Sequence, residues 1–349
     1  MIVFAKQIMK RIIICVLVIS LTALSAGARR ATAGRSSGPV EMTLQAAGVP
    51  EPNDKYGLVL QADEQGDCNA VALYEEAVKA LPKDTKNITR WRKTAPEELP
   101  VKQVRAELKR FEPSLKLVEQ AARCSKCQWP DGQTGMMFGN QYLTIAQARG
   151  LQARLDIAQK KYDSAIHNLQ TGIGMARHVA DGPTLIHGLV GAGVGALALK
   201  EAEYLIGAPD SPNLYWALES LPKPLIDLSG QMDAEMANIE SQYLNPVTRI
   251  AMKRQLELAH ERVRVVTKKL DRQAAALQCI EAVRLYAARH DGRFPNQLSD
   301  ITEVSIPVDP LSGKGFVYKR SGSEAVLEAV LPETATPKDA LKYNLTLKE

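Results

Sequence analysis

The chain has few aromatic residues, few cysteines and little net charge. Aromatic residues make up only 5% of the 349 residues, and an interior of small and straight-chain apolar residues favours packed helices over a fold dominated by sheets. Five cysteines are too few for a scaffold held together by disulfides, so the core must come from apolar packing. A net charge of +5 is too small to indicate a nucleic-acid-binding protein.

Familiar catalytic motifs are also missing from the sequence. It contains no His-Glu-x-x-His motif and no spaced cluster of acids. The segment Gly191-Ala192-Gly193-Val194-Gly195-Ala196 has the spacing of a dinucleotide fingerprint, but a helical pattern precedes it where that fingerprint requires a strand. We therefore expect no catalytic residues, no cofactor and no bound metal, and we favour a non-enzymatic role.

Residues 1–28 predict a secretory signal peptide. Three basic residues at positions 6, 10 and 11 precede an apolar run at 12–24, and small residues follow at 26–28. A membrane-spanning helix needs roughly 20 apolar residues, which is longer than this run. We expect export to the periplasm or cell envelope, with no stable membrane span once the signal is removed.

The next two segments predict a linker and a helical domain. Residues 29–53 are rich in Ala, Gly and Ser and predict a flexible linker. Residues 54–245 predict a domain of helical hairpins, because apolar residues recur at steps of three and four. Pro113 lies inside one of these helices and predicts a kink or a break. The expected helices cover residues 69–81, 101–124, 140–159, 162–179, 184–206, 214–219 and 224–243.

Residues 246–331 predict one long helix followed by a small β-hairpin element. The helix extends from 246 to 290. A heptad seam in it pairs either within the chain or between two copies, so a homodimer through the long helix is one expectation. Short strands are expected at 316–318 and 325–330, and residues 332–349 predict a loose tail. The seam residues are Leu256, Ala259, Val263, Val266 and Leu270. The fold class is therefore mainly α, with a small C-terminal α+β element.

Two segments share the spacing of a helical repeat. The first is Ala70-x3-Tyr74-x2-Ala77-x4-Pro82, and a weaker copy begins at Tyr162-Asp163-Ser164-Ala165-Ile166. Small residues at these spacings let helices approach, an aromatic residue fills the groove, and Pro ends the unit. The pattern resembles the second helix of a tetratricopeptide repeat. That resemblance implies a helical scaffold that binds protein or peptide partners.

The C-terminal segment has a different resemblance. Tyr286-x4-Asp291-Gly292-Arg293-Phe294-Pro295 is followed by Asp309-Pro310-x-Ser312-Gly313-x-x-Phe316-x-Tyr318. Gly292 can end a helix and Pro295 prevents its extension. The pattern is similar to the soluble domain of type II secretion pseudopilins, which implies a helix packed against a small antiparallel sheet. The combination of both patterns resembles exported bacterial proteins.

One cysteine motif is a candidate for chemistry. In Cys124-Ser125-Lys126-Cys127 the two-residue spacing allows a disulfide, a redox pair or half of a zinc site. A preceding strand, which the thioredoxin-like arrangement requires, and a second cysteine pair for zinc are missing from the sequence. Cys124 and Cys127 are therefore a candidate disulfide or redox pair.

The sequence as a whole favours an exported, non-enzymatic helical scaffold that binds protein or peptide partners in the cell envelope. One alternative is a thiol-disulfide or metal-binding protein of the envelope that uses Cys124 and Cys127. A second alternative is a subunit of a secretion or pilus-like assembly built on the C-terminal segment.

Overall fold

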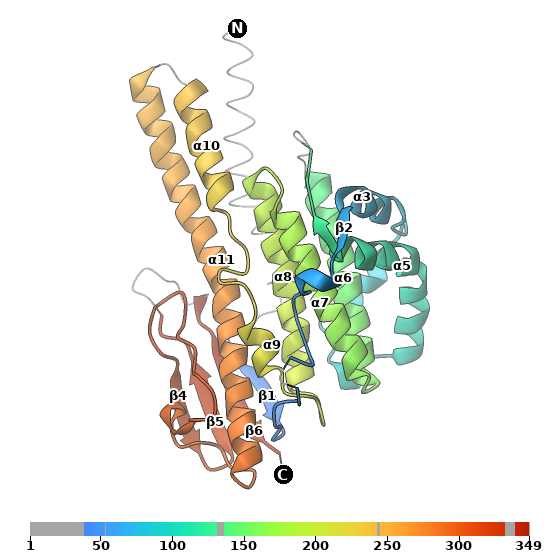
Figure 1. The fold of residues 1–349 in the computed structure, drawn as a ribbon, viewed down its shortest axis with the longest axis vertical. Helices are drawn as coiled ribbons and strands as arrows, with labels where there is room; N and C mark the ends of the chain where they lie inside the picture. Colours follow the sequence, from blue (N-terminus) through green and yellow to red (C-terminus); the bar gives the residue numbers. More distant parts are fainter. Residues whose placement is uncertain (1–37, 53, 131–135, 243–244, 332–338, 349) are drawn as a thin grey trace. The chain divides into compact units, whose positions relative to one another are not determined.

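The computed structural model describes residues 38–52, 54–130, 136–242, 245–331 and 339–348. The fold is mainly helical with a small mixed sheet, which confirms the predicted fold class (Figure 1). The chain divides into two compact units. Residues 229–265 belong to one unit, and residues 39–228 and 266–349 form the other. The predicted signal peptide at 1–28 lies outside the described residues.

Residues 39–228 contain most of the helices that the sequence predicts. Helix α3 packs against α5, while α6, α7 and α8 pack against one another. The apolar periodicity predicts all of these helices to within a few residues, except the short α4. The helices are α3 (Val71–Lys79), α4 (Lys86–Trp91), α5 (Val101–Ala122), α6 (Met136–Ala158), α7 (Tyr162–Ala180), α8 (Leu185–Ile206) and α9 (Tyr215–Glu219).

Helix α5 continues through Pro113 as a single helix, so the expected break does not occur. Pro113 is on the exposed side of α5, where water can bond the carbonyl that the proline leaves without a donor. On the opposite side, Phe111 and Val118 are completely buried. Packing of that side holds α5 together despite the lost hydrogen bond.

The glycine-rich segment lies inside α8 and not at a strand-to-helix turn. A Cβ on Gly191 would lie 2.5 Å from the carbonyl oxygen of Ala176 and 2.6 Å from the Cβ of Ala180. Glycine therefore lets α7 and α8 approach closely. Helix α8 is long and apolar enough to cross a membrane by length and composition, and 61% of its most apolar stretch is buried.

A four-stranded sheet closes the same unit, with the strand order β1-β6-β5-β4. Strands β4 (Val317–Ser321) and β5 (Glu324–Glu328) form the predicted hairpin. Strand β6 (Lys342–Leu347) pairs antiparallel with β5, and β1 (Val40–Leu44) pairs parallel with β6. One face of the sheet lies along the second half of α11 (Pro246–Arg289) (Figure 1).

Strands β1 and β6 correct two expectations. The predicted linker at 29–53 contains β1, and the predicted tail at 332–349 contains β6. In both strands apolar and polar residues alternate, so that Met42 and Leu44 point into the core together with Tyr343 and Leu345. These strands are short and pair with each other across about three hundred residues of sequence, so neither is recognisable by itself.

Residues 229–265 form a helical hairpin. Helix α10 (Ser229–Gln242) pairs with the first half of α11. The ammonium group of Lys253 forms an ion pair with Glu240, and Nε2 of His260 lies 3.5 Å from the Glu235 carboxylate. These contacts join the two helices along their length.

The predicted heptad seam of α11 is covered within the chain. Leu256, Val263 and Leu270 are all buried. Leu270 packs on α8, because its Cδ2 atom lies 3.2 Å from the position of a Cβ on Gly195. This burial agrees with pairing of the seam within the chain, and a homodimer through the long helix stays a prediction.

Truncation of Leu44 tests whether β1 belongs to the folded core. Leu44 is completely buried, so Leu44→Ala should lower the free energy of unfolding by about 2–4 kcal/mol. The matched control is Thr43→Ala at the adjacent exposed position, which should change it by less than about 0.5 kcal/mol. Equilibrium unfolding in urea measures both values, and equal effects of the two substitutions would contradict the role of β1.

Candidate functional site

A disulfide joins Cys68 to Cys124, with Cα atoms 4.9 Å apart. Cys68 lies on β2 (Gly66–Asn69) and Cys124 on β3 (Cys124–Lys126), and the two strands form a small parallel pair. The bond closes a loop that spans 56 positions in the sequence. Cys68 is exposed, whereas Cys124 is buried. The disulfide therefore ties the segment before α3 to the end of α5.

This bond corrects the pairing of Cys124 with Cys127 that the sequence spacing suggested. Cys127 is free. Residues three apart on an extended strand are separated by about 10 Å, whereas a disulfide requires Cα atoms roughly 4.4–6.8 Å apart. Strand β3 begins at Cys124 and therefore carries Cys127 away from it. The sequence contains no signal that selects Cys68 as the partner.

Aromatic side chains pack around His178, whose side chain hydrogen bonds with the backbone of Cys124. The hydroxyl group of Tyr74 hydrogen bonds with Nδ1 of His178 over 3.1 Å, and Nε1 of Trp129 donates to the backbone carbonyl of His178 over 2.6 Å. The rings of Tyr74 and Trp129 stack with centroids 6.1 Å apart, and Tyr142 meets Trp129 edge to face. We call Tyr74, Trp129, Tyr142, His178 and Cys127 the aromatic cluster.

Burial keeps the titratable groups of the aromatic cluster neutral. Burial, together with the charge of Arg177, lowers the pKa of His178 to about 4. Burial and the carboxylate of Asp181 raise the pKa of the Cys127 thiol well above its ordinary value. Because the thiolate is the nucleophile in thiol chemistry, Cys127 is held in its unreactive form at neutral pH. The aromatic cluster is therefore a packed set of neutral side chains.

In the described ranges, no group of three or more His, Cys, Asp and Glu side chains is placed to hold a metal ion. Two small cavities flank Gly150 and Glu201, each with a volume of about 10 Å³, which is room for about one water molecule.

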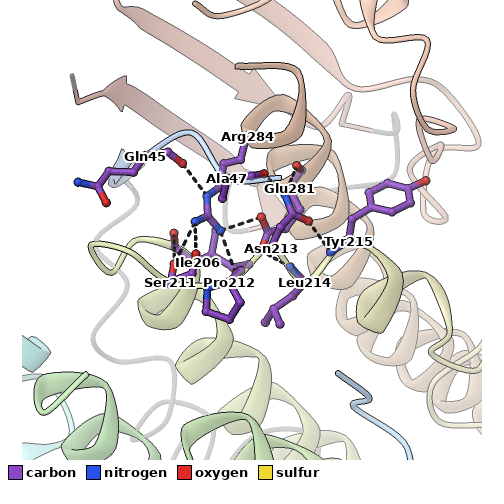
Figure 2. Close-up of polar contacts among 10 residues, drawn as sticks. All are labelled: Gln45, Ala47, Ile206, Ser211, Pro212, Asn213, Leu214, Tyr215, Glu281 and Arg284. Atoms are coloured by element: carbon purple, nitrogen blue, oxygen red, sulfur yellow. Dashed lines mark hydrogen bonds and ion pairs between the residues drawn. The ribbon is translucent and has the colours of Figure 1, made fainter. Parts of the chain in front are cut away.

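The second concentration of buried polar groups is an ion pair on α11. Glu281 and Arg284 are both completely buried, and Oε2 of Glu281 lies 2.8 Å from Nη1 of Arg284 (Figure 2). Burial raises the pKa of Glu281, and the Arg284 guanidinium together with the amide of Leu214 opposes that rise. The Leu214 amide donates to Oε1 of Glu281 over 2.8 Å.

The guanidinium of Arg284 has a partner for each of its five N–H groups. Its Nε donates to the carbonyl of Gln45 over 3.0 Å, and Nη1 donates to the carbonyl of Pro212 as well as to Glu281. Its Nη2 donates to both oxygen atoms of Ser211. Figure 2 shows these bonds converging from the segment that follows β1 and from the loop after α8. Since every donor is occupied, Arg284 positions the fold and leaves no donor for a ligand.

Two other buried arginines have the same role. Arg154 pairs with Glu201 and donates to three backbone carbonyls at the end of α4, between residues 91 and 94. Arg272 grips Asp309 through two parallel bonds of 2.9 and 2.7 Å. The sequence does not predict these pairs, because their one signal is an arginine within an apolar stretch.

Comparisons with family models, with curated proteins and with solved structures gave no match. The resemblances to tetratricopeptide repeats and to pseudopilins therefore stay predictions.

Removal of the disulfide should destabilise the protein strongly. The double variant Cys68→Ser, Cys124→Ala frees the unfolded chain from a loop of this size, which should lower the free energy of unfolding by about 4 kcal/mol. Cys127→Ser is the control and should leave the disulfide intact. Urea unfolding measures the values, and reduction of the wild-type protein should reproduce the double variant. An unfolding curve that does not respond to reductant would argue against the bond.

The aromatic cluster predicts a loss of stability in acid. The pKa of His178 is about 4 in the folded chain and about 6.5 when unfolded, so below pH 6.5 the unfolded state binds a proton that the folded state does not. His178 should therefore cost about 3 kcal/mol of stability as the pH falls from 6.5 to 4. In His178→Asn that part of the pH dependence should disappear. Urea midpoints across this pH range give the comparison, and equal slopes in both proteins would refute it.

Proposed function

We propose that this chain is an exported helical scaffold that binds a protein partner through the exposed side of α11. The observation that carries this proposal is a set of exposed apolar side chains on the first half of that helix. Val247 is 77% exposed, Ile250 is 67% exposed and Leu258 is 54% exposed. Exposed apolar side chains gathered on one helix face are typical of protein interfaces.

These side chains lie on the side of α11 opposite its buried seam. At 100° per residue, Val247 and Leu258 project in nearly the same direction, about 180° from Leu256. Charged residues lie among the apolar ones, as in an interface that forms between soluble proteins. We call this surface the outer face of α11, and its members are Val247, Ile250, Ala251, Arg254, Leu258, Glu261 and Val265.

The disulfide supports a location outside the cytoplasm. Bonds such as Cys68–Cys124 form and persist in oxidising compartments and are rare in reducing ones. The expected signal peptide at residues 1–28 supports the same location. An envelope scaffold of this kind fits the helical hairpins that the sequence predicts.

The two alternative functions have less support. A thiol-disulfide or metal role for Cys124 and Cys127 requires a reactive pair, whereas Cys124 is bonded to Cys68 and the pKa of the Cys127 thiol is raised by burial. A role in a secretion or pilus-like assembly rests on the C-terminal segment. The sheet in that segment draws β1 and β6 from outside residues 246–331, unlike the compact hairpin that the resemblance implies.

Photo-cross-linking in the living cell tests the proposal. Benzoylphenylalanine in place of Leu258 should give a protein adduct in the envelope, because a partner on the outer face covers this exposed position. The same residue in place of Lys102, which is exposed on α5, is the control and should give none. Mass spectrometry identifies the adduct. If position 258 yields no adduct, or no more than position 102 yields, the outer face is not a docking surface.

A further inference from the structure

The outer face of α11 carries a second heptad pattern, separate from the buried seam. Val247, Ala251, Arg254, Leu258, Glu261 and Val265 follow one another at steps of four, three, four, three and four. This spacing places all six on one side of the helix and is typical of helices that pair along their length. Four of the six are apolar, and the other two have opposite charges.

Both charges on this side are accessible to a partner. Arg254 and Glu261 are exposed, and the Glu261 carboxylate has a neighbour one turn along in Arg264, at 3.5 Å with both side chains exposed. Exposed pairs of this kind contribute little, so a partner helix can recruit Glu261 at small cost.

We propose that the partner on the outer face is a second copy of this chain, docked antiparallel about a twofold axis midway between positions 254 and 258. This inference rests on the proposed function and names the occupant of its docking surface. The axis then lies at the level of position 256, and each residue faces the residue equally far on the other side of 256 in the second copy. Val247 faces Val265 of the second copy, and Arg254 faces Leu258 of the second copy.

Charge complementarity selects this arrangement. A helical side chain leans towards the N-terminus of its own helix, so Arg254 leans towards the level of Ala251. Glu261 of the second copy faces Ala251. Its carboxylate therefore meets the guanidinium of Arg254. The twofold axis repeats the contact, which gives two ion pairs in one self-complementary interface. The aliphatic part of Arg254 meanwhile covers Leu258 of the second copy.

Parallel pairing of the same faces is unfavourable. It would place Arg254 against Arg254 of the second copy and Glu261 against its own equivalent, and like charges at facing positions repel. In the antiparallel arrangement the two helices contact each other along about 27 Å, from position 247 to position 265 at 1.5 Å per residue. All of these positions lie within the hairpin unit.

Charge reversal with rescue tests the proposal on the chain as cells export it. Sedimentation equilibrium should detect a dimer of the wild-type protein. Arg254→Glu and Glu261→Lys each turn two attractions into two repulsions, so each should weaken dimerisation by about tenfold or more. The double variant restores opposite charges and should recover most of the wild-type affinity.

Two controls isolate the interface. Lys102→Glu changes the net charge by the same amount as Arg254→Glu, at an exposed position on α5, and should leave dimerisation unchanged. Glu261→Lys and the double variant both lose the contact with Arg264, so that loss cannot explain a recovery. Circular dichroism melts should be alike for all variants, because the substituted side chains are exposed.

Several outcomes would overturn the inference. A wild-type monomer at the highest soluble concentration would do so, as would a double variant that is as weak as the single variants. The cross-link from position 258 separates this failure from failure of the proposed function. An adduct with a different protein would overturn the self-pairing and leave the scaffold role in place. An adduct with residues 1–37 of the same chain, or no adduct, would overturn both.

Discussion

The ion pair between Glu281 and Arg284 is the constraint on which the larger unit depends. Both side chains are completely buried, and an unpaired buried charge costs several kcal/mol, on the order of 3–5. Arg284 is neutralised and fully hydrogen bonded only when Gln45 and Ser211 are in place. These residues lie far from α11 in the sequence. The pair therefore couples β1, the loop after α8 and the central helix, so that no one of them can form alone without leaving a buried charge unsatisfied.

The same logic explains how a chain so poor in aromatic residues fixes its helices in place. Alanine and leucine surfaces are nearly uniform and allow helices to slide, whereas a guanidinium fork has directional bonds. Arg154 attaches the end of α4 to α8 through Glu201, and Arg272 attaches the loop at Asp309 to α11. Close approach supplies the rest of the specificity, because Gly191 admits α7 to within contact of the α8 backbone. Buried arginine ion pairs and close contacts at glycine together fix the positions of the helices, as large aromatic side chains do in other cores.

Sequence patterns predicted the local structure well and the long-range structure poorly, for physical reasons. A helix is recognisable because its apolar residues repeat within the helix itself, and α7 and α11 end within a residue of their expected limits. Strands β1 and β6 have only five and six residues, and each forms only when it pairs with a distant part of the chain or with the hairpin before it. The cysteine pair shows the same limit. A spacing of two residues suggested Cys127, whereas the direction of β3 and the fold of residues 68–124 bring Cys68 to Cys124.

The two halves of helix α11 differ in what constrains their sequences. Most residues of its second half are buried, including both Arg272 and Arg284, so its sequence is constrained by the fold. Its first half has α10 as a neighbour and keeps exposed the apolar residues Val247 and Ile250, which the fold of one chain does not require. Exposed apolar side chains on a soluble helix reduce solubility unless something covers them. Because Arg254 and Glu261 carry opposite charges and lie on opposite sides of the proposed twofold axis on the same face, the surface is complementary to itself. A partner of unrelated sequence would have to supply both charges in that order, whereas a second copy does so by symmetry.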